Sequence, residues 1–138
     1  DRAVLRADGN IRFIGRFSEM FKSGGYNVYP REVELVLESH SSVAIAAVVG
    51  VPDPLFDEVG WAYVVPTSAG ACSQVDWRDW CGKELAAYKI PKRFIVCTEL
   101  PLLPIGKVDK VSLRKQATAQ ALEATALHRA GSVIPHTA

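Results

Sequence analysis

The chain has 138 residues, almost half of them hydrophobic (49%), which is typical of a single globular domain. Its 16 basic and 15 acidic side chains are interspersed and leave a formal net charge of +1, so we expect no basic face for nucleic acid or an anionic membrane. No apolar run approaches the ~20 residues of a membrane span, so we expect no transmembrane helix.

The N-terminal segment predicts a β-hairpin followed by a loop. The chain opens D-R-A-V-L-R-A-D-G, with neither an initiator Met nor a signal peptide, and we interpret this opening as that of a fragment. Two short apolar stretches within Ala3–Gly15 flank Asp8-Gly9, a dipeptide suited to the positive φ angles of a tight hairpin turn. Gly24 and Gly25 come next, and two adjacent glycines favour a loop with unusual backbone angles.

A helix and two strands are expected after this loop. Pro30 suits the first position of a helix, because its missing N–H would have no partner there in any case. Apolar residues recur at helical spacing after Pro30, and we expect the helix to end near His40. The run V-A-I-A-A-V-V-G-V, residues 43–51, predicts a buried strand, and W-A-Y-V-V, residues 61–65, predicts its neighbour in the sheet.

Two further helices and a strand are expected in the second half. The pattern Ser73-x-x-Asp76 resembles a capping box, and an apolar face with two tryptophans continues from it to Tyr88. We interpret that face as core rather than as a platform for stacking nucleotides. Residues 94–97 predict another strand, and Asp109 is placed to cap a last helix over residues 110–127.

These elements together predict an α+β fold, a small sheet with helices packed against it and preceded by a β-hairpin. The three cysteines, Cys72, Cys81 and Cys97, are far apart, and neither a C-x-x-C pair nor the histidine spacing indicates a metal site. We therefore expect reduced thiols, no bound metal and a cytoplasmic location.

The residues that suggest chemistry have ordinary explanations when each is taken alone. A Gly-Gly pair is most often a turn, and a lone lysine such as Lys107 is most often a solvated surface residue. Gly106-Lys107 is not a phosphate-binding P-loop, because the pattern G-x-x-x-x-G-K-[ST] is missing. The order and spacing of these residues carry more information than the residues themselves.

The run G-R-F-S-E-M-F-K-S-G-G-Y-N-V-Y-P-R-E-V-E, residues 15–34, resembles the hinge and glycine-rich motif of adenylate-forming enzymes. That superfamily includes acyl- and aryl-CoA synthetases, peptide-synthetase adenylation domains and luciferases. Further resemblances follow in the family's order: the buried strand, Y-K-I-P at residues 88–91, and L-P-L-L-P-I-G-K-V-D-K at residues 100–110, which resembles the terminal catalytic-lysine motif. The chain is most similar to the C-terminal lid domain of an acyl- or aryl-CoA ligase.

The resemblance implies a domain organisation and a reaction. Residues 1–17 would lead from a missing N-terminal domain, residues 18–127 would form the lid, and residues 128–138 would be a flexible tail. The complete enzyme would join a carboxylic acid to ATP, releasing pyrophosphate, and pass the acyl group to CoA. ATP and CoA would be substrates, with Mg²⁺ accompanying ATP at the N-terminal domain. The isolated chain is expected to be inactive.

The resemblance also implies roles for the residues of the first motif. Asp1 and Arg16 match residues that contact the nucleotide, and Ser18 falls at the hinge, where many relatives have Asp or Lys. A hinge depends on accessible backbone angles more than on one side chain, so this difference need not abolish movement. Glu32 matches an acidic position to which we assign a structural role.

Two loops would serve the two steps of the reaction. Lys107 matches the lysine that enters the active site during adenylation, where an ammonium offsets the repulsion between carboxylate and phosphate. The glycine-rich loop would let the pantetheine arm of CoA approach; its residues are Gly24, Gly25, Tyr26 and Asn27.

The sequence is also compatible with other functions. A stand-alone or peptide-synthetase adenylation domain that loads a carrier protein shares these motifs, although no D-S-L carrier signature follows Lys107. A noncatalytic interaction module on the same fold is a further alternative. The pattern P-x-x-x-x-G-K, from Pro101 to Lys107, also resembles the site at which bacterial acyl-CoA synthetases are acetylated, so a lysine acetyltransferase and a deacetylase are expected partners.

Overall fold

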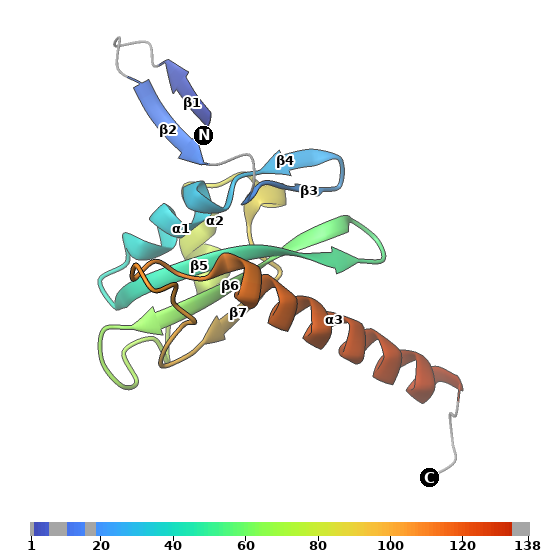
Figure 1. Ribbon diagram of the computed structural model, residues 1–138. Coiled ribbons are helices and arrows are strands. Elements are labelled where there is room, and N and C mark those ends of the chain that lie inside the picture. Colours follow the sequence, from blue (N-terminus) through green and yellow to red (C-terminus); the bar gives the residue numbers. More distant parts are fainter. Residues whose placement is uncertain (1, 6–10, 16–18, 134–138) are drawn as a thin grey trace.

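A computed structural model describes residues 2–5, 11–15 and 19–133, with side-chain surroundings for residues 19–124. Strands β1 (Arg2–Leu5) and β2 (Ile11–Gly15) pair antiparallel, which confirms the predicted hairpin. The predicted turn at Asp8-Gly9 lies outside the described residues. In Figure 1 this hairpin stands apart from the larger sheet.

A five-stranded sheet forms the centre of the domain. The strand order is β4-β3-β6-β5, and β7 also pairs with β6; this β6–β7 pair is parallel, whereas the other pairs are antiparallel. The strands are β3 (Phe21–Ser23), β4 (Tyr26–Val28), β5 (Val43–Asp53), β6 (Asp57–Pro66) and β7 (Arg93–Val96). The long predicted strands are confirmed, and β5 and β6 extend to a shared turn.

Helices cover both faces of the sheet (Figure 1). Helices α1 (Pro30–Glu38) and α2 (Trp77–Gly82) pack on one face, and α3 (Lys110–Val133) packs on the other. Along β5, Ala46 and Val48 belong to the first core, while Ala47 and Val49 belong to the second. Burial on both faces explains why this strand is almost continuously apolar instead of alternating with polar residues. The predicted α+β class is confirmed.

The helix predicted from Ser73 to Tyr88 is wrong in its bounds. The N-cap of α2 is Asp76, whose side chain accepts a hydrogen bond from the Asp79 N–H at 3.1 Å. The helix ends at Gly82, a residue type with low helix propensity, and a separate 3-10 helix, η2 (Ala87–Lys89), follows. Trp77 is buried in the core as predicted, but Tyr88 is 38% exposed.

Helix α3 begins where it was predicted to begin and extends further. The Asp109 carboxylate accepts a hydrogen bond from the Ser112 N–H at 3.1 Å, which confirms the predicted cap. The helix continues to Val133, so residues 128–133 of the expected tail are helical. Figure 1 shows its C-terminal half projecting away from the sheet. None of the helices in the described ranges is long and apolar enough to cross a membrane.

Candidate functional site

The Lys107 turn, which we define as Leu102–Val108, is a tight structure held by backbone hydrogen bonds. Leu102 and Val108 form an isolated antiparallel bridge, and the Leu103 N–H donates to the Lys107 carbonyl at 2.7 Å. The Gly106 N–H donates to the Leu103 carbonyl at 2.8 Å, and Gly106 has a φ of +90°. Residues other than glycine rarely adopt such a backbone angle, so Gly106 allows the chain to reverse just before Lys107.

The Lys107 side chain is exposed on this turn. Within residues 19–124, no hydrogen bond or ion pair is found for its ammonium group. Three apolar side chains of the turn are also exposed: Leu102 is 58%, Leu103 39% and Ile105 75% accessible. The lysine is therefore neither buried in this domain's own core nor held by a described internal partner, and its charge is free to act on a group outside the domain.

The base of the Lys107 turn is attached to the edge of the sheet. Strand β5 is an edge strand, so its outward N–H and C=O groups need partners. The Val48 N–H donates to the Glu34 carboxylate at 2.9 Å, and the Val48 carbonyl accepts from the Lys110 ammonium at 3.0 Å. Glu34 and Lys110 also form an ion pair with each other. Glu34 from α1 and Lys110 from α3 thus take the place of a neighbouring strand.

Sequence analysis did not predict that these two residues form a pair. It singled out Glu32, whose carboxylate forms an ion pair with the Lys89 ammonium at 2.8 Å. Glu34, two residues further on, is 4% exposed and belongs to the apolar side of α1. A glutamate at a buried helical position was the available signal, because a carboxylate is rarely buried unless it is paired.

The glycine hairpin, which we define as Ser23–Tyr26, forms the tight turn between β3 and β4. Gly24 has a φ of +58° and Gly25 a φ of +88°, so the predicted unusual backbone is confirmed. The Gly24 N–H donates to the Phe56 carbonyl at 2.9 Å, which fixes the hairpin to the β5–β6 turn. A Cβ added at Gly25 would meet no atom within 4 Å, so the space beside it is open.

Aromatic side chains lie beside the glycine hairpin. Tyr26 is 61% exposed and stacks on Tyr88 with a ring separation of 4.8 Å. The Lys92 ammonium lies 5.0 Å from the centre of the Phe56 ring. Asn27, which follows the hairpin in β4, is also exposed. The sequence had assigned Tyr88 to the core; instead it adds a second exposed ring to the predicted loop.

The two candidate loops occupy different parts of the domain. In Figure 1 the glycine hairpin, at the turn between β3 and β4, and the segment leading into α3 lie well apart. The structure therefore does not bring Lys107 and the predicted glycine loop into one site. Asp1, Arg16 and Ser18 lie outside the described residues.

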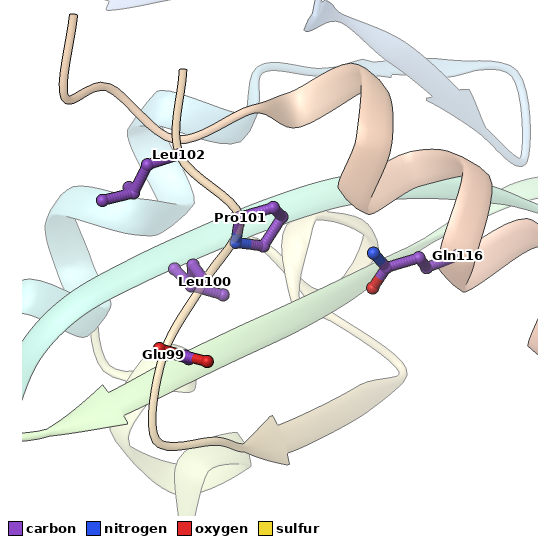
Figure 2. A pocket seen from close by; sticks show the side chains of 5 residues that line it. All are labelled: Glu99, Leu100, Pro101, Leu102 and Gln116. Carbon is purple, nitrogen blue, oxygen red and sulfur yellow. The ribbon is translucent and has the colours of Figure 1, made fainter. Parts of the chain in front are cut away.

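A shallow pocket lies beside the chain that enters the Lys107 turn (Figure 2). Gln116 reaches it from α3, and the remaining lining residues come from the segment between β7 and α3: Glu99, Leu100, Pro101 and Leu102. One carboxylate and one amide among apolar side chains do not make a reaction centre. Across residues 19–124, no group of three or more His, Cys, Asp or Glu side chains is arranged to hold a metal ion.

Two of the three cysteines are poor candidates for a nucleophile. All three are free, and Cys81 is buried. Burial raises the pKa of the Cys81 thiol to about 11 and also raises the pKa of Cys97, because a thiolate is disfavoured away from water. These two thiols are therefore protonated at neutral pH, and Lys107 is the better candidate for chemistry.

Comparison with known proteins identifies the class. Residues 32–107 match the family described as AMP-binding enzyme C-terminal domain. The chain is 42% identical to sulfoacetate–CoA ligase of Cupriavidus necator over 85% of its own length and 23% of that protein. It resembles a fatty acyl CoA synthetase of Mycobacterium tuberculosis with a TM-score of 0.71 and 35% identity, covering 86% of this chain and 23% of the other.

A solved o-succinylbenzoate CoA synthetase from Bacillus subtilis, in complex with an acyl-adenylate intermediate, is also similar. Its TM-score is 0.71 and its identity 37%, over 81% of this chain and 23% of that one. The chain belongs to the AMP-binding enzyme C-terminal domain family. It spans about a quarter of the length of the relatives that it matches.

Proposed function

We propose that this chain is the C-terminal lid domain of an ATP-dependent carboxylic acid:CoA ligase, and that it is inactive alone. In the first half-reaction a carboxylate attacks the α-phosphorus of ATP, and pyrophosphate leaves. In the second, the CoA thiol attacks the acyl-adenylate carbonyl, and AMP leaves. Membership of the family supports this proposal, and so does the similarity to a sulfoacetate–CoA ligase and a feruloyl-CoA synthase.

The observation that carries the proposal is the exposed ammonium of Lys107 on a turn with a fixed backbone. Adenylation brings two anions together, and negative charge develops at the α-phosphate. A preorganised ammonium stabilises that charge most effectively where water is excluded. In our proposal the Lys107 turn enters a larger N-terminal domain, whose walls cover the apolar side chains around the lysine.

The glycine hairpin would serve the second half-reaction. Gly24 and Gly25 expose bare backbone, and the open space beside Gly25 leaves room for a pantetheine arm next to Tyr26 and Asn27. Because this hairpin and Lys107 lie apart in the domain, one rigid lid would present them in turn by rotating about Ser18. Asp1 and Arg16 would contact the nucleotide near that hinge.

The test separates the two half-reactions in the full-length enzyme. We expect Lys107→Ala to slow acyl-adenylate formation at least ~10²–10³-fold, the loss typical of one preorganised donor. Pyrophosphate exchange measures this step. Thioester formation from pre-made acyl-adenylate should change little. Lys115→Ala, at an exposed lysine on α3, is the matched control and should affect neither step. Equal loss of both half-reactions in Lys107→Ala would contradict the division of labour.

The same full-length enzyme is used to identify the acceptor of the acyl group. We expect CoA to accept the acyl group, and transfer to a carrier protein instead would identify an adenylation domain that loads a carrier. Failure to form any acyl-adenylate would favour a noncatalytic interaction module. ATP would arrive with Mg²⁺ bound at the N-terminal domain, and we propose a cytoplasmic location, in keeping with the free cysteines.

Acetylation of Lys107 would regulate the enzyme by removing the charge that adenylation requires. The exposure of this side chain supports access by a lysine acetyltransferase and a deacetylase. Mass spectrometry after incubation with an acetyltransferase tests this, and an unmodified Lys107 would count against it.

A further inference from the structure

Lys110 lies at a junction of three elements. Its ammonium donates to the Val48 carbonyl of β5 at 3.0 Å and pairs with the Glu34 carboxylate of α1. The Glu19 carboxylate lies 3.6 Å away as a third partner. The ammonium therefore donates hydrogen bonds to Glu34 and Val48 and has the Glu19 carboxylate as a longer ion-pair partner.

The partners of Lys110 are themselves held in place. One carboxylate oxygen of Glu34 accepts from the Val48 N–H at 2.9 Å, and the other accepts from Arg31 at 3.4 Å. The Glu34 side chain is 5% exposed and that of Lys110 18%. In such a poorly hydrated place electrostatic attraction is strong, and leaving either charge unpaired is costly. The junction therefore holds one arrangement.

The junction lies between the two segments that the proposed mechanism uses. Lys110 is three positions after Lys107 and is the first residue of α3. Glu19 directly follows Ser18, the proposed hinge residue. The Asp109 N–H, next to Lys110, donates to the Pro101 carbonyl at 2.8 Å and closes the base of the Lys107 turn. Contacts of one side chain thus connect the chain that leaves the hinge with the base of the Lys107 turn.

We propose that Lys110 is a positioning residue for adenylation: its ammonium holds the Lys107 turn in a fixed relation to β5 and to the chain leaving the hinge. This inference rests on the proposed function. Rotation about the hinge then delivers the Lys107 ammonium to one defined place, instead of to a range of places. Since a misplacement of about 1 Å can lower a rate about 10²-fold, the fixed relation matters for the rate. The described partners of the Lys110 ammonium do not include any residue of the glycine hairpin.

Four variants of the full-length enzyme test the proposal. Lys110→Met keeps most of the apolar side chain and removes the ammonium, and Lys110→Arg keeps the positive charge. The double variant Glu34→Gln/Lys110→Met removes both charges, so that no buried carboxylate is left unpaired. Glu19→Gln weakens only the longer ion pair. Lys115→Met, on the same helix and exposed, is the control. Each variant is measured by pyrophosphate exchange, by thioester formation from pre-made acyl-adenylate, and by thermal unfolding.

We expect Lys110→Met to lower the kcat of adenylation about 10- to 100-fold, with the KM for ATP changed less than about twofold, because Lys107 acts in the transition state. Thioester formation should stay within about twofold of the parent enzyme. The double variant should regain thermal stability without regaining adenylation, and Lys110→Arg should regain part of the adenylation rate. Glu19→Gln should show the same selective loss at smaller size.

Two results would overturn the proposal. If Lys110→Met lowered both half-reactions together, the junction would serve only to stabilise the fold. If the double variant recovered adenylation along with stability, the unpaired Glu34 carboxylate would account for the loss. Lys107→Ala, measured in parallel, distinguishes failure of the positioning role of Lys110 from failure of the proposed function. If Lys107→Ala slows adenylation alone but Lys110→Met does not, only the positioning role of Lys110 is contradicted. If Lys107→Ala slows adenylation and thioester formation equally, the proposed function is contradicted.

Discussion

Apolar side chains are buried in helix α1 but exposed in the Lys107 turn. In α1, Val33 and Leu37 are completely covered at 0% exposed, whereas Leu102 and Ile105 in the turn are 58% and 75% exposed. The helix is stabilised by the hydrophobic core against which it packs. The turn is held by backbone hydrogen bonds and by the Lys110 junction at its base. The exposed side chains of Leu102, Leu103 and Ile105 are thereby available for contact with another domain.

The largest effect expected from this contrast is on a matched pair of leucines. Leu37→Ala should lower the free energy of unfolding by about 2–5 kcal/mol, because it leaves a cavity under α1. Leu103→Ala removes the same atoms from the exposed turn and should change stability by less than about 0.5 kcal/mol. Urea unfolding of the 138-residue chain, followed by tryptophan fluorescence, measures both. Similar losses in the two variants would mean that the turn contributes to the core.

A matched pair of glycines sharpens the same contrast. A Cβ added at Gly50 in β5 would lie 2.5 Å from the Phe21 Cγ, too close for the packed core, so Gly50→Ala should cost at least about 1–3 kcal/mol. Gly82→Ala is the control, since its nearest neighbour would be 3.9 Å away at the end of α2. The control should be neutral or slightly stabilising by reducing the freedom of the unfolded chain. Thermal unfolding distinguishes the two, and a neutral Gly50→Ala would contradict the packing described for β5.

A smaller effect concerns the cap of α2. Asp76→Ala removes the side chain that accepts the Asp79 N–H and should cost about 1 kcal/mol. Ser73→Ala should cost almost nothing, because Ser73 lies outside the helix. Urea midpoints measure the difference. A larger loss at Ser73 would restore the capping box that the sequence pattern predicted.

The smallest effect is expected at Cys81. Burial raises its pKa to about 11, so the thiol stays protonated in the folded chain through pH 8 to 9. Its contribution to stability is complete below the ordinary thiol pKa and is lost only as the pH rises toward 11. Iodoacetamide at pH 8 should modify half-buried Cys97 before Cys81, with Cys81 reacting after denaturation. Peptide mapping by mass spectrometry checks the order, and early labelling of Cys81 would show that the α2 core opens readily.

Local patterns predicted those elements whose cause is local. Pro30 starts α1, and Asp109 caps α3, because both depend on backbone groups within one helical turn. The apolar run of β5 identified a strand buried on both faces. The bounds of α2 were wrong because its apolar face continues past Gly82 in sequence although the helix does not. The periodicity of apolar residues indicates which side chains are buried. It does not indicate where the helical backbone hydrogen bonds end.

The sequence by itself determined the fold class, the glycine hairpin and the place of Lys107 in a family motif, because short-range backbone chemistry and residue order carry that information. Only the tertiary structure decided the long-range contacts. The Glu34–Lys110 pair joins residues 76 positions apart, and Tyr26 stacks on Tyr88 from another element. A charged or aromatic residue in a sequence shows that it needs a partner. Which partner it finds depends on how the helices are set against the edge of the sheet.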